Sequence, residues 1–275
     1  MKHISTPLIG ITLGIAIIVG AYIYEGGSVA AFFLIPAISI VLGGTLAATL
    51  AGTTFARFLL IPSFLRIAFA GRVHNTVAII EQFVEFNALS RREGFLILRD
   101  KLYEVEFLFF RKMLRLCVDG MTVEQIHETA HAEMESINER HLDNIALFKK
   151  MAGYSPTMGI IGTVVGLITT LGAVNSNPAM LIQHIALAFI ATLWGILLAN
   201  MLWLPIAERL TTLHNEELRT MRLVLDGITA LLNGSAPSVT RATLASVLPS
   251  VQQDALISKP LPVVRIAPIV PESMQ

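Results

Sequence analysis

Long apolar runs alternate with charged stretches along this chain, and the runs form two pairs. Residues 7–24 and 29–55 make up the first pair, and residues 156–174 and 178–207 make up the second. A helix needs about 20 apolar residues to cross a membrane. No Asp, Glu, Lys or Arg lies between Lys150 and Glu208, and residues 175–178 are long enough only for a tight turn. The pattern therefore predicts four membrane-spanning helices.

We expect the N-terminal apolar run to be a membrane span and not a signal peptide. It is long, and it is followed by a second apolar run instead of an A-x-A cleavage pattern. The two runs are joined by a short loop around Glu25-Gly26-Gly27. We therefore expect two spans at the start of the chain.

Between the two pairs lies a charged segment whose apolar positions recur at helical spacing. The period predicts helices over Val73–Leu89 and Gly94–Val118. Thr122 followed by Gln125 is typical of a capping box, and the helix it opens is expected to continue through Lys150 into the third span. Because each helix has an apolar stripe, the helices should pack as a bundle.

The chain after the fourth run is amphipathic and then rich in proline. We expect a helix over Glu208–Leu232 and a short one over Pro237–Leu248, with Leu244 and Val247 making its contacts. The last residues should be disordered. The predicted domains are 1–55 (spans one and two), 56–150 (a cytoplasmic helical domain), 151–207 (spans three and four), 208–250 (C-terminal helices) and 251–275 (tail).

Composition and charge agree with a membrane protein. Of the 275 residues, 54% are hydrophobic and 15% are charged, and the net charge of zero favours no nucleic acid as a partner. Residues 53–151 hold thirteen of the twenty Lys and Arg residues, whereas the short connections hold none. Basic residues mark the cytoplasmic side. The predicted fold is an all-α membrane protein with four transmembrane helices, a cytoplasmic helical domain between spans two and three, and both termini cytoplasmic.

One face of the third span is small and hydroxylated. Its members, at helical spacing, are Pro156, Gly159, Thr163, Gly166 and Thr170, with Gly162 also four residues before Gly166. The fourth span offers a comparable face with Thr192, Gly195, Ala199 and, near its end, Pro205. Small residues allow close helix packing. Alternatively, hydroxyls and the carbonyl groups that proline leaves open line a path for an ion.

Two features of the central segment carry candidate chemistry. Charges gather in Ser90–Gly94 and again in Arg99–Lys101, either as a solvated surface or as a docking surface for a partner of complementary charge. Residues 127–131 read HETAH, which matches the HExxH zinc pattern. A catalytic zinc needs a third ligand, and His141 is too far along the same helix to supply one. We therefore expect no metal, although a membrane metalloprotease stays open.

The motifs SPTMGIIGTVVGLI and ATLWGILLANMLWLPIAERL resemble the MotA/PomA family of flagellar motor stator subunits. The resemblance extends to Gly43-Gly44, to SRREG in the central segment and to NGSAPSVTRATLASVLP near the end. The order of four spans with a large segment after the second also matches. An energiser of outer-membrane processes similar to ExbB/TolQ is the alternative, because those transporters share the motif of spans three and four.

The resemblance implies a subunit of the bacterial inner membrane that is not an enzyme and holds no cofactor. Five copies would surround two copies of a MotB/PomB-like partner, whose single span carries the ion-binding aspartate and whose outer domain binds peptidoglycan. The ring would turn the rotor protein FliG by translocating sodium or protons.

The resemblance also assigns residues. The functional prolines of the family fall on Pro156 and Pro205, and the hydroxyls beside the ion fall on Thr163 and Thr192; Thr163 favours sodium, although the proton stays open. The rotor-contacting arginine falls on Arg91, with Arg92 beside it. The acidic residue eight positions later is replaced by Arg99, so that Asp100 is expected to take its role. Gly159, Gly162, Gly166 and Gly195 are expected to pack the helices.

Overall fold

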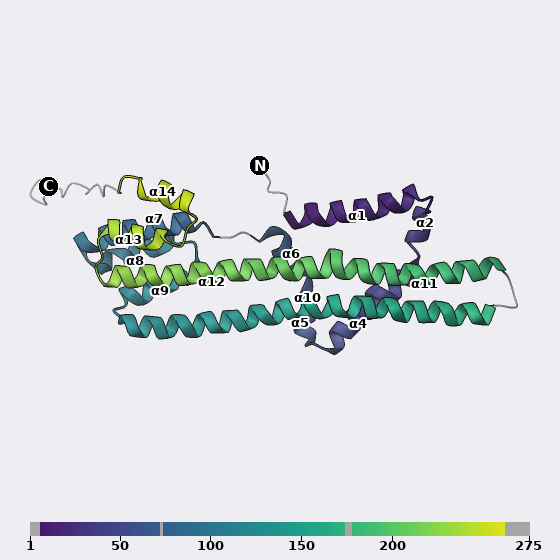
Figure 1. Cartoon of the computed structure of the whole chain (residues 1–275). Helices are drawn as coiled ribbons and strands as arrows, with labels where there is room; N and C mark the ends of the chain where they lie inside the picture. Colours follow the sequence, from purple (N-terminus) through teal and green to yellow (C-terminus); the bar gives the residue numbers. More distant parts are fainter. Residues whose placement is uncertain (1–5, 72–73, 174–177, 262–275) are drawn as a thin grey trace, which may run out of the picture. The chain divides into compact units, whose positions relative to one another are not determined.

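The computed structural model describes residues 6–71, 74–173 and 178–261, and these residues are helical without any strand (Figure 1). They divide into two compact units, residues 1–72 with 139–214 and residues 73–138 with 215–275. Two long helices, α10 (Val123–Ala173) and α12 (Leu204–Leu232), contribute residues to both units. The predicted all-helical class is therefore confirmed, and each unit is described in turn.

The first unit holds the apolar helices. They are α1 (Thr6–Tyr24), α2 (Val29–Phe32), α3 (Ile35–Ile38), a π-helical turn (Ser39–Gly43), α4 (Gly44–Ala51), α5 (Phe55–Leu59), α6 (Ile61–Ala70), α11 (Pro178–Leu198) and a second π-helical turn (Ala199–Trp203). Among the described residues, three helices are long and apolar enough to cross a membrane, within Pro7–Tyr24, Val123–Gly172 and His184–Leu232. The expected turn at residues 175–177 lies outside the described residues.

The second predicted span is not one helix. Within residues 29–55 the chain breaks at Phe33 and Leu34, and the apolar helix that follows covers only Ile35–Ala51. Pro36 lies in the first turn of that helix, where its fixed φ and its missing N–H are tolerated, and Leu34 before the helix is extended. The indole N–H of Trp194 donates to the carbonyl oxygen of Phe32 at 2.8 Å. One carbonyl group released by the break is thereby satisfied inside the apolar unit.

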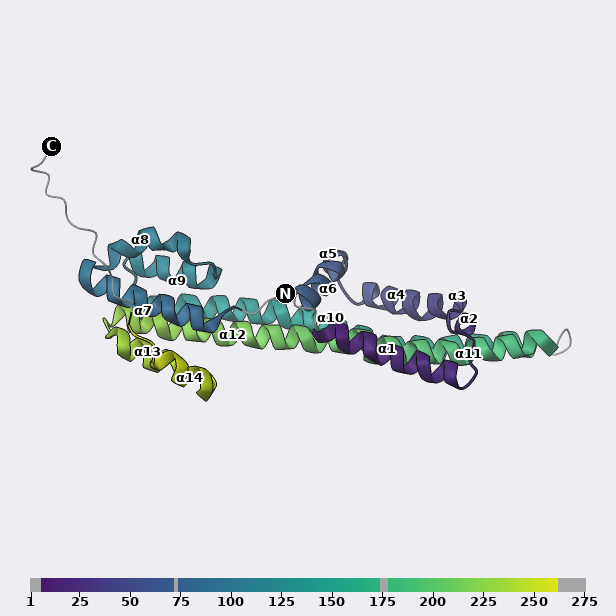
Figure 2. The ribbon, with the colours of Figure 1, turned by 90° about the horizontal axis from the view of Figure 1, so that it is seen from above.

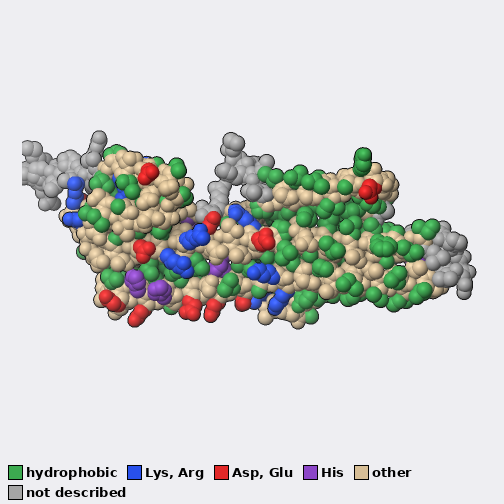
Figure 3. All heavy atoms as spheres, in the orientation of Figure 1, with side chains coloured by type: hydrophobic (Ala, Val, Ile, Leu, Met, Phe, Trp, Pro, Cys, Tyr) green, Lys and Arg blue, Asp and Glu red, His purple; other side chains and the backbone are tan. Residues whose placement is uncertain are grey.

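Close contacts at small residues hold the first unit together. A Cβ atom added to Gly14 of α1 would lie 2.7 Å from Sδ of Met201, and one added to Gly44 of α4 would lie 2.6 Å from Sδ of Met158. Figures 1 and 2 both show α1 and α10 running beside α11. The face of this unit around α1 and α11 is covered mostly by hydrophobic side chains (Figure 3). Such a surface fits lipid better than water.

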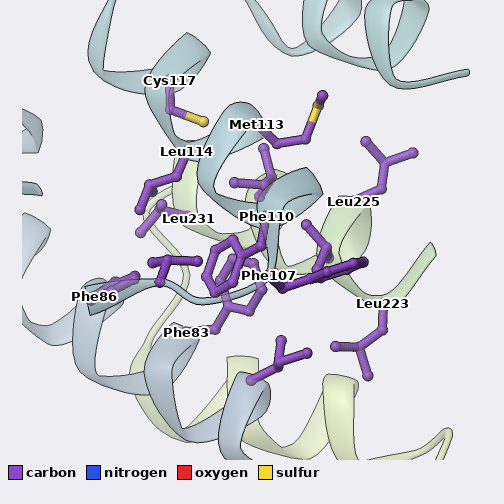
Figure 4. Packing of buried hydrophobic residues seen from close by; sticks show 14 of the residues in the cluster. Phe83, Phe86, Phe107, Phe110, Met113, Leu114, Cys117, Leu223, Leu225 and Leu231 are labelled. Atoms are coloured by element: carbon purple, nitrogen blue, oxygen red, sulfur yellow. The ribbon is translucent and has the colours of Figure 1, made fainter. Parts of the chain in front are cut away.

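The second unit packs around an aromatic core. Its helices are α7 (Thr76–Glu93), α8 (Leu98–Lys101), α9 (Leu108–Val118), α13 (Pro237–Ala245) and α14 (Ser250–Ile257), with the adjoining parts of α10 and α12. The rings of Phe83 and Phe110 stack with centroids 4.2 Å apart (Figure 4). Gly227 of α12 allows this, because a Cβ atom there would lie 2.6 Å from the ring of Phe83. The expected helical bundle is present.

Three local predictions for this unit are wrong. Residues 94–118 form two 3₁₀ turns, α8 and α9 instead of one helix, since Gly94 ends α7 at φ 82° and residues 105–107 are extended or turned. Val247 is exposed, whereas Leu244 is buried as expected. Residues 251–257 of the predicted tail belong to α14 (Ser250–Ile257), which buries Leu256 despite the flanking prolines. Residues 262–275 lie outside the described part of the chain.

The predicted start of α10 is confirmed. The side chain of Gln125 accepts a hydrogen bond from the N–H of Thr122 at 3.0 Å, and the hydroxyl of Thr122 accepts one from the N–H of Gln125 at 3.3 Å. This reciprocal pair satisfies two of the free N–H groups at the helix start. From there α10 continues for 51 residues to Ala173, through Lys150 as expected.

Candidate functional site

The backbones of α10 and α11 touch at glycine residues. A Cβ atom added to Gly195 would lie 2.7 Å from the carbonyl oxygen of Ser155 and 3.2 Å from Cα of Pro156. A Cβ atom on Gly159 would lie 3.0 Å from the carbonyl oxygen of Ala191. Because these distances are below van der Waals contact, only glycine permits this approach of the two helices.

Two further glycines continue the contact along α10. A Cβ atom on Gly162 would lie 2.6 Å from Cβ of Ala191, and one on Gly166 would lie 2.9 Å from Cβ of Ala188. All four glycines singled out in the sequence therefore lie in the α10–α11 contact, and all four are buried. The contact extends over about two helical turns of α10.

The hydroxyl groups of Thr163 and Thr192 meet in this contact. Their Oγ1 atoms hydrogen bond to each other, and Oγ1 of Thr163 also lies 3.1 Å from the carbonyl oxygens of Gly159 and Ala188. Each hydroxyl has one proton to donate but can accept as well. Four oxygen atoms thus gather at the Thr163–Thr192 contact, and both side chains are half-buried. Neutral hydroxyl and carbonyl oxygens are the kind of ligand that a cation can use.

The two prolines flank this oxygen cluster along the chain. Pro156 lies inside α10, and Pro205 lies in the first turn of α12 directly after the π-helical turn Ala199–Trp203. Proline has no N–H, so Pro156 cannot donate to the carbonyl of Ala152 and Pro205 cannot donate to that of Met201. The sequence analysis singled out both prolines but did not predict the π-helical turn. Such turns are common at functional sites.

Sequence reasoning missed several polar side chains of this unit. Thr45 and Thr49 of α4 are buried, and Oγ1 of Thr45 lies 3.4 Å from Oγ of the buried Ser155. Asn200, in the π-helical turn, is exposed and donates to the carbonyl oxygen of Ile196 at 2.9 Å. The sequence signal that could have identified these side chains is a polar residue within an apolar run. Ser155 directly precedes Pro156, and Asn200 lies in the π-helical turn before Pro205, so these polar groups are close to the two prolines along the chain.

The four charged residues that the sequence singled out lie at two places on the surface of the second unit. Arg91 and Arg92 occupy the last turn of α7, where positive charge is favourable for the helix dipole, and Nη1 of Arg91 donates to the carbonyl oxygen of Gly234 at 3.3 Å. Arg99 and Asp100 belong to α8 and line a hollow of about 510 Å³.

The hollow at α8 carries mixed charge. Arg115 and Asp119 also line it, so two arginines and two aspartates face one space. Next to it, Nζ of Lys101 lies 2.7 Å from Oε1 of Glu104, and this contact raises the pKa of Lys101 above its usual value. Arg91, Arg92, Arg99 and Asp100 are all exposed. They can therefore reach a partner, and Arg115 and Asp119 extend the set that the sequence singled out.

The HExxH pattern does not build a metal site in the described residues. Nε2 of His127 hydrogen bonds to Oγ1 of Thr229 at 2.8 Å, and the rings of His127 and His131 have centroids 6.1 Å apart. Nowhere in residues 6–71, 74–173 and 178–261 do three His, Cys, Asp or Glu side chains gather as metal ligands would. The stripe of Ile126, Ala130 and Met134 on the same helix is buried as core.

Comparison with known proteins gives matches over most of the chain. The model of the MotA/TolQ/ExbB proton channel family matches residues 102–223. Motility protein A of Bacillus subtilis (strain 168) is 32% identical over 247 residues, covering 90% of this chain and 91% of the relative. The chemotaxis protein PomA of Vibrio alginolyticus is 30% identical over 241 residues, covering 88% of this chain and 94% of the relative.

A solved structure agrees with these matches. The flagellar MotAB stator complex from Bacillus subtilis contains a chain that superposes with a TM-score of 0.84 at 32% sequence identity. The superposition covers 91% of this chain and 98% of that chain. The likeness therefore includes the charged second unit as well as the apolar helices.

Proposed function

The chain belongs to the family of motility protein A, the flagellar motor stator subunits within the MotA/TolQ/ExbB proton channel family, and on this basis we propose how it couples ion flux to torque. The matches along the whole length favour the stator interpretation over an ExbB/TolQ-like energiser. The observation that carries the mechanism is the cluster of oxygen atoms around Thr163 and Thr192 in a stretch without charged side chains. The family consists of ion-channel subunits and is not a class of enzymes.

The proposed assembly is a ring of five copies in the bacterial inner membrane. Each copy crosses the membrane four times, with α1, the helix Ile35–Ala51, α10 and α11 as spans and with both termini in the cytoplasm. The excess of Lys and Arg in residues 53–151 supports this orientation. The ring encloses two copies of a one-span partner that binds peptidoglycan, in line with the stator complex named MotAB to which the chain is similar.

The ion meets the oxygen cluster but is held by the partner. Residues 151–207 contain no carboxylate, so the negative charge that binds the ion has to come from the span of the partner. Thr163 and Thr192 offer their hydroxyl oxygens to the ion beside that carboxylate, and the carbonyl groups of Gly159 and Ala188 lie next to them. Several neutral oxygens suit sodium, a hard cation, and we therefore propose sodium as the translocated ion. The ion is cargo, and the mechanism needs no cofactor.

Binding and release of the ion drive the rotation. Moving one charge through 100 mV releases about 2.3 kcal/mol, roughly four times the thermal energy, which biases a small rotation of packed helices. Loss of charge at the partner carboxylate changes its attraction to the oxygen cluster. Pro156 and Pro205, whose helices lack one backbone hydrogen bond each, take up the resulting change in shape.

The charged residues of the second unit deliver the torque. Arg91 and Arg92 at the end of α7, and Arg99 and Asp100 in α8, push the rotor protein FliG through complementary charges. Charges on such exposed surfaces set register and approach rate. Asp100 takes the acidic role that the family places at the position of Arg99, because both side chains face the same hollow.

Complementation of a bacterial strain that lacks its stator proteins tests this function. The chain should restore swimming when it is produced with its one-span partner, and it should fail without the partner. The variant Pro205→Leu should be present in the membrane at the normal level and should not support swimming. Swimming at full speed with Pro205→Leu, or no swimming with the chain and its partner, would contradict the proposal.

A further inference from the structure

A second hollow lies in the first unit where its helices change from apolar to charged. It has a volume of about 510 Å³ and is lined by Ala51, Gly52, Thr53, Thr54, Arg57, Asp143, Ala146, Leu147 and Lys150. On one side the apolar helix Ile35–Ala51 ends at the hollow. On the other side Lys150 is the last charged residue of α10 before the charge-free stretch. In a membrane, both sides therefore reach the head-group level at this hollow.

The charges in the hollow favour an anion. Nη2 of Arg57 pairs with Oδ2 of Asp143 at 2.9 Å. Lys150 is exposed and makes no ion pair with any residue that the structure describes. One positive charge thus remains after the Arg57–Asp143 pair is subtracted. The hydroxyl of Thr53 is a further donor at the wall of the hollow.

Apolar side chains are exposed directly beside the hollow. Phe55 and Leu59 of α5 are 65% and 60% exposed, and Leu60 is 50% exposed. Phe55 directly follows the lining residues Thr53 and Thr54 in the chain, and Leu59 and Leu60 come one turn of helix later. A soluble anion would gain nothing from these side chains, whereas a ligand with an acyl chain would cover them.

We propose that this hollow binds the phosphate head group of an anionic phospholipid of the cytoplasmic leaflet. Lys150 and Arg57 contact the phosphate, Thr53 donates a hydrogen bond, and the acyl chains lie along Phe55 and Leu59. Basic pockets between membrane helices on the cytoplasmic side are suited to such head groups. The site goes beyond ion conduction, and it requires only that the first unit is in the membrane.

The residue next to Lys150 provides a matched control. Lys149 carries the same charge, is exposed on the same helix and does not line the hollow. The full chain, purified in a non-ionic detergent, is titrated with dioleoylphosphatidylglycerol, and the lipids that remain bound are counted by native mass spectrometry. Lys150→Gln should reduce the affinity for this lipid roughly tenfold, a change of about 1.4 kcal/mol. Lys149→Gln should bind as the unchanged protein does, and Lys150→Arg should retain binding.

Two further probes of the unchanged chain separate the sources of phosphate. Dioleoylphosphatidylcholine should bind more weakly than the anionic lipid, and soluble glycerol phosphate should not displace the lipid. Equal loss in Lys149→Gln and Lys150→Gln would overturn the proposal, because it would indicate a general basic belt. Equal binding of the two lipids, or displacement by glycerol phosphate, would overturn it as well, whether or not the variants fold.

Discussion

The hydroxyl group of Thr163 on α10 hydrogen bonds to the hydroxyl group of Thr192 on α11, at a place where glycines bring the two helices into backbone contact. The same Thr163 oxygen lies 3.1 Å from the carbonyl oxygen of Ala188. A pair of threonines in ordinary helix packing would direct each hydroxyl to its own helix. Here the hydroxyl of Thr163 bonds both to the carbonyl oxygen of Gly159 on its own helix and to the hydroxyl of Thr192 across the contact, so that oxygens of both helices gather at one place.

Replacing Thr163 by Val tests the need for its oxygen. Valine keeps the shape of threonine, so the helices should still pack, but one oxygen ligand is lost. We expect the rotation speed of motors that contain Thr163→Val to fall by about tenfold or more, as expected if the lost ligand costs about 1.4 kcal/mol. Thr163→Ser, which keeps the oxygen, should retain most of the speed. Equal speeds for the two variants in a bead assay would show that packing alone matters at this position.

Replacing Gly195 by Ala tests the close approach of α10 and α11. The new Cβ atom would lie 2.7 Å from the carbonyl oxygen of Ser155, so the helices must separate. We expect the free energy of unfolding to fall by about 1–3 kcal/mol, as for other overpacked sites. Gly172→Ala is the control on α10, because nothing lies within 4 Å of its new Cβ atom. Thermal unfolding in detergent should separate the two variants, and an equal effect would argue against the contact.

Reversing the charge of Asp100 tests its acidic role. Asp100→Lys should abolish swimming while membrane levels stay normal, because the side chain is exposed and makes no buried contact. A matched charge reversal in FliG should restore part of the swimming. Asp254→Lys, at an exposed position of α14, is the control and should have little effect. Normal swimming of cells with Asp100→Lys would remove this residue from the rotor contact.

Replacing Thr240 by Val tests a buried polar pair in the second unit. Nδ2 of Asn87 donates to Oγ1 of Thr240 at 2.7 Å, and both residues are 0% exposed. Valine would leave the amide without this partner, and we expect a loss of about 1–3 kcal/mol in the free energy of unfolding. Thr243→Val on the exposed side of α13 should be nearly neutral. Denaturant unfolding that finds the two variants equally stable would contradict this role.

The thiol of Cys117 should be inert in the folded chain. Burial raises its pKa to about 12, so almost no thiolate exists at pH 7.5. Because the unfolded thiol ionises near pH 8.5, the folded state should lose stability as the pH rises from there toward 12. Maleimide labelling should be slow before unfolding and rapid after it, whereas exposed Arg115→Cys should label at once. Fast labelling of Cys117 in the folded chain would contradict its burial.

The sequence predicted the parts of the fold that depend on composition and period. The charge-free stretch before Glu208 predicted α11, the period of apolar residues predicted α7 and α12, and the Thr122–Gln125 pair predicted the start of α10. The break after Phe32 has a local signal in Pro36, because the chain before a proline tends to leave the helical region, and the predicted span overlooked this signal. The hydrogen bond from the indole N–H of Trp194 to the carbonyl oxygen of Phe32 joins residues 162 positions apart, and no local pattern could predict it.

The candidate site, too, was predictable from the sequence only in part. Helical spacing placed Thr163 and the four glycines on one face of α10 or α11, but it could not show that Thr163 and Thr192 meet. Nor could it show that Thr45 lies beside Ser155, since that requires the register between α4 and α10. The hollow shared by Asp100 and Arg115 depends on the break between α8 and α9, which the sequence did not predict.

The central claim is that sodium reaches a carboxylate of the partner through the oxygens of Thr163 and Thr192. Rotation of a bead attached to one motor, in a stator-less strain that produces this chain and its partner, tests it most directly when sodium is replaced by potassium at fixed pH. Rotation should stop in potassium and resume when sodium returns. Rotation that continues unchanged in potassium would contradict the claim.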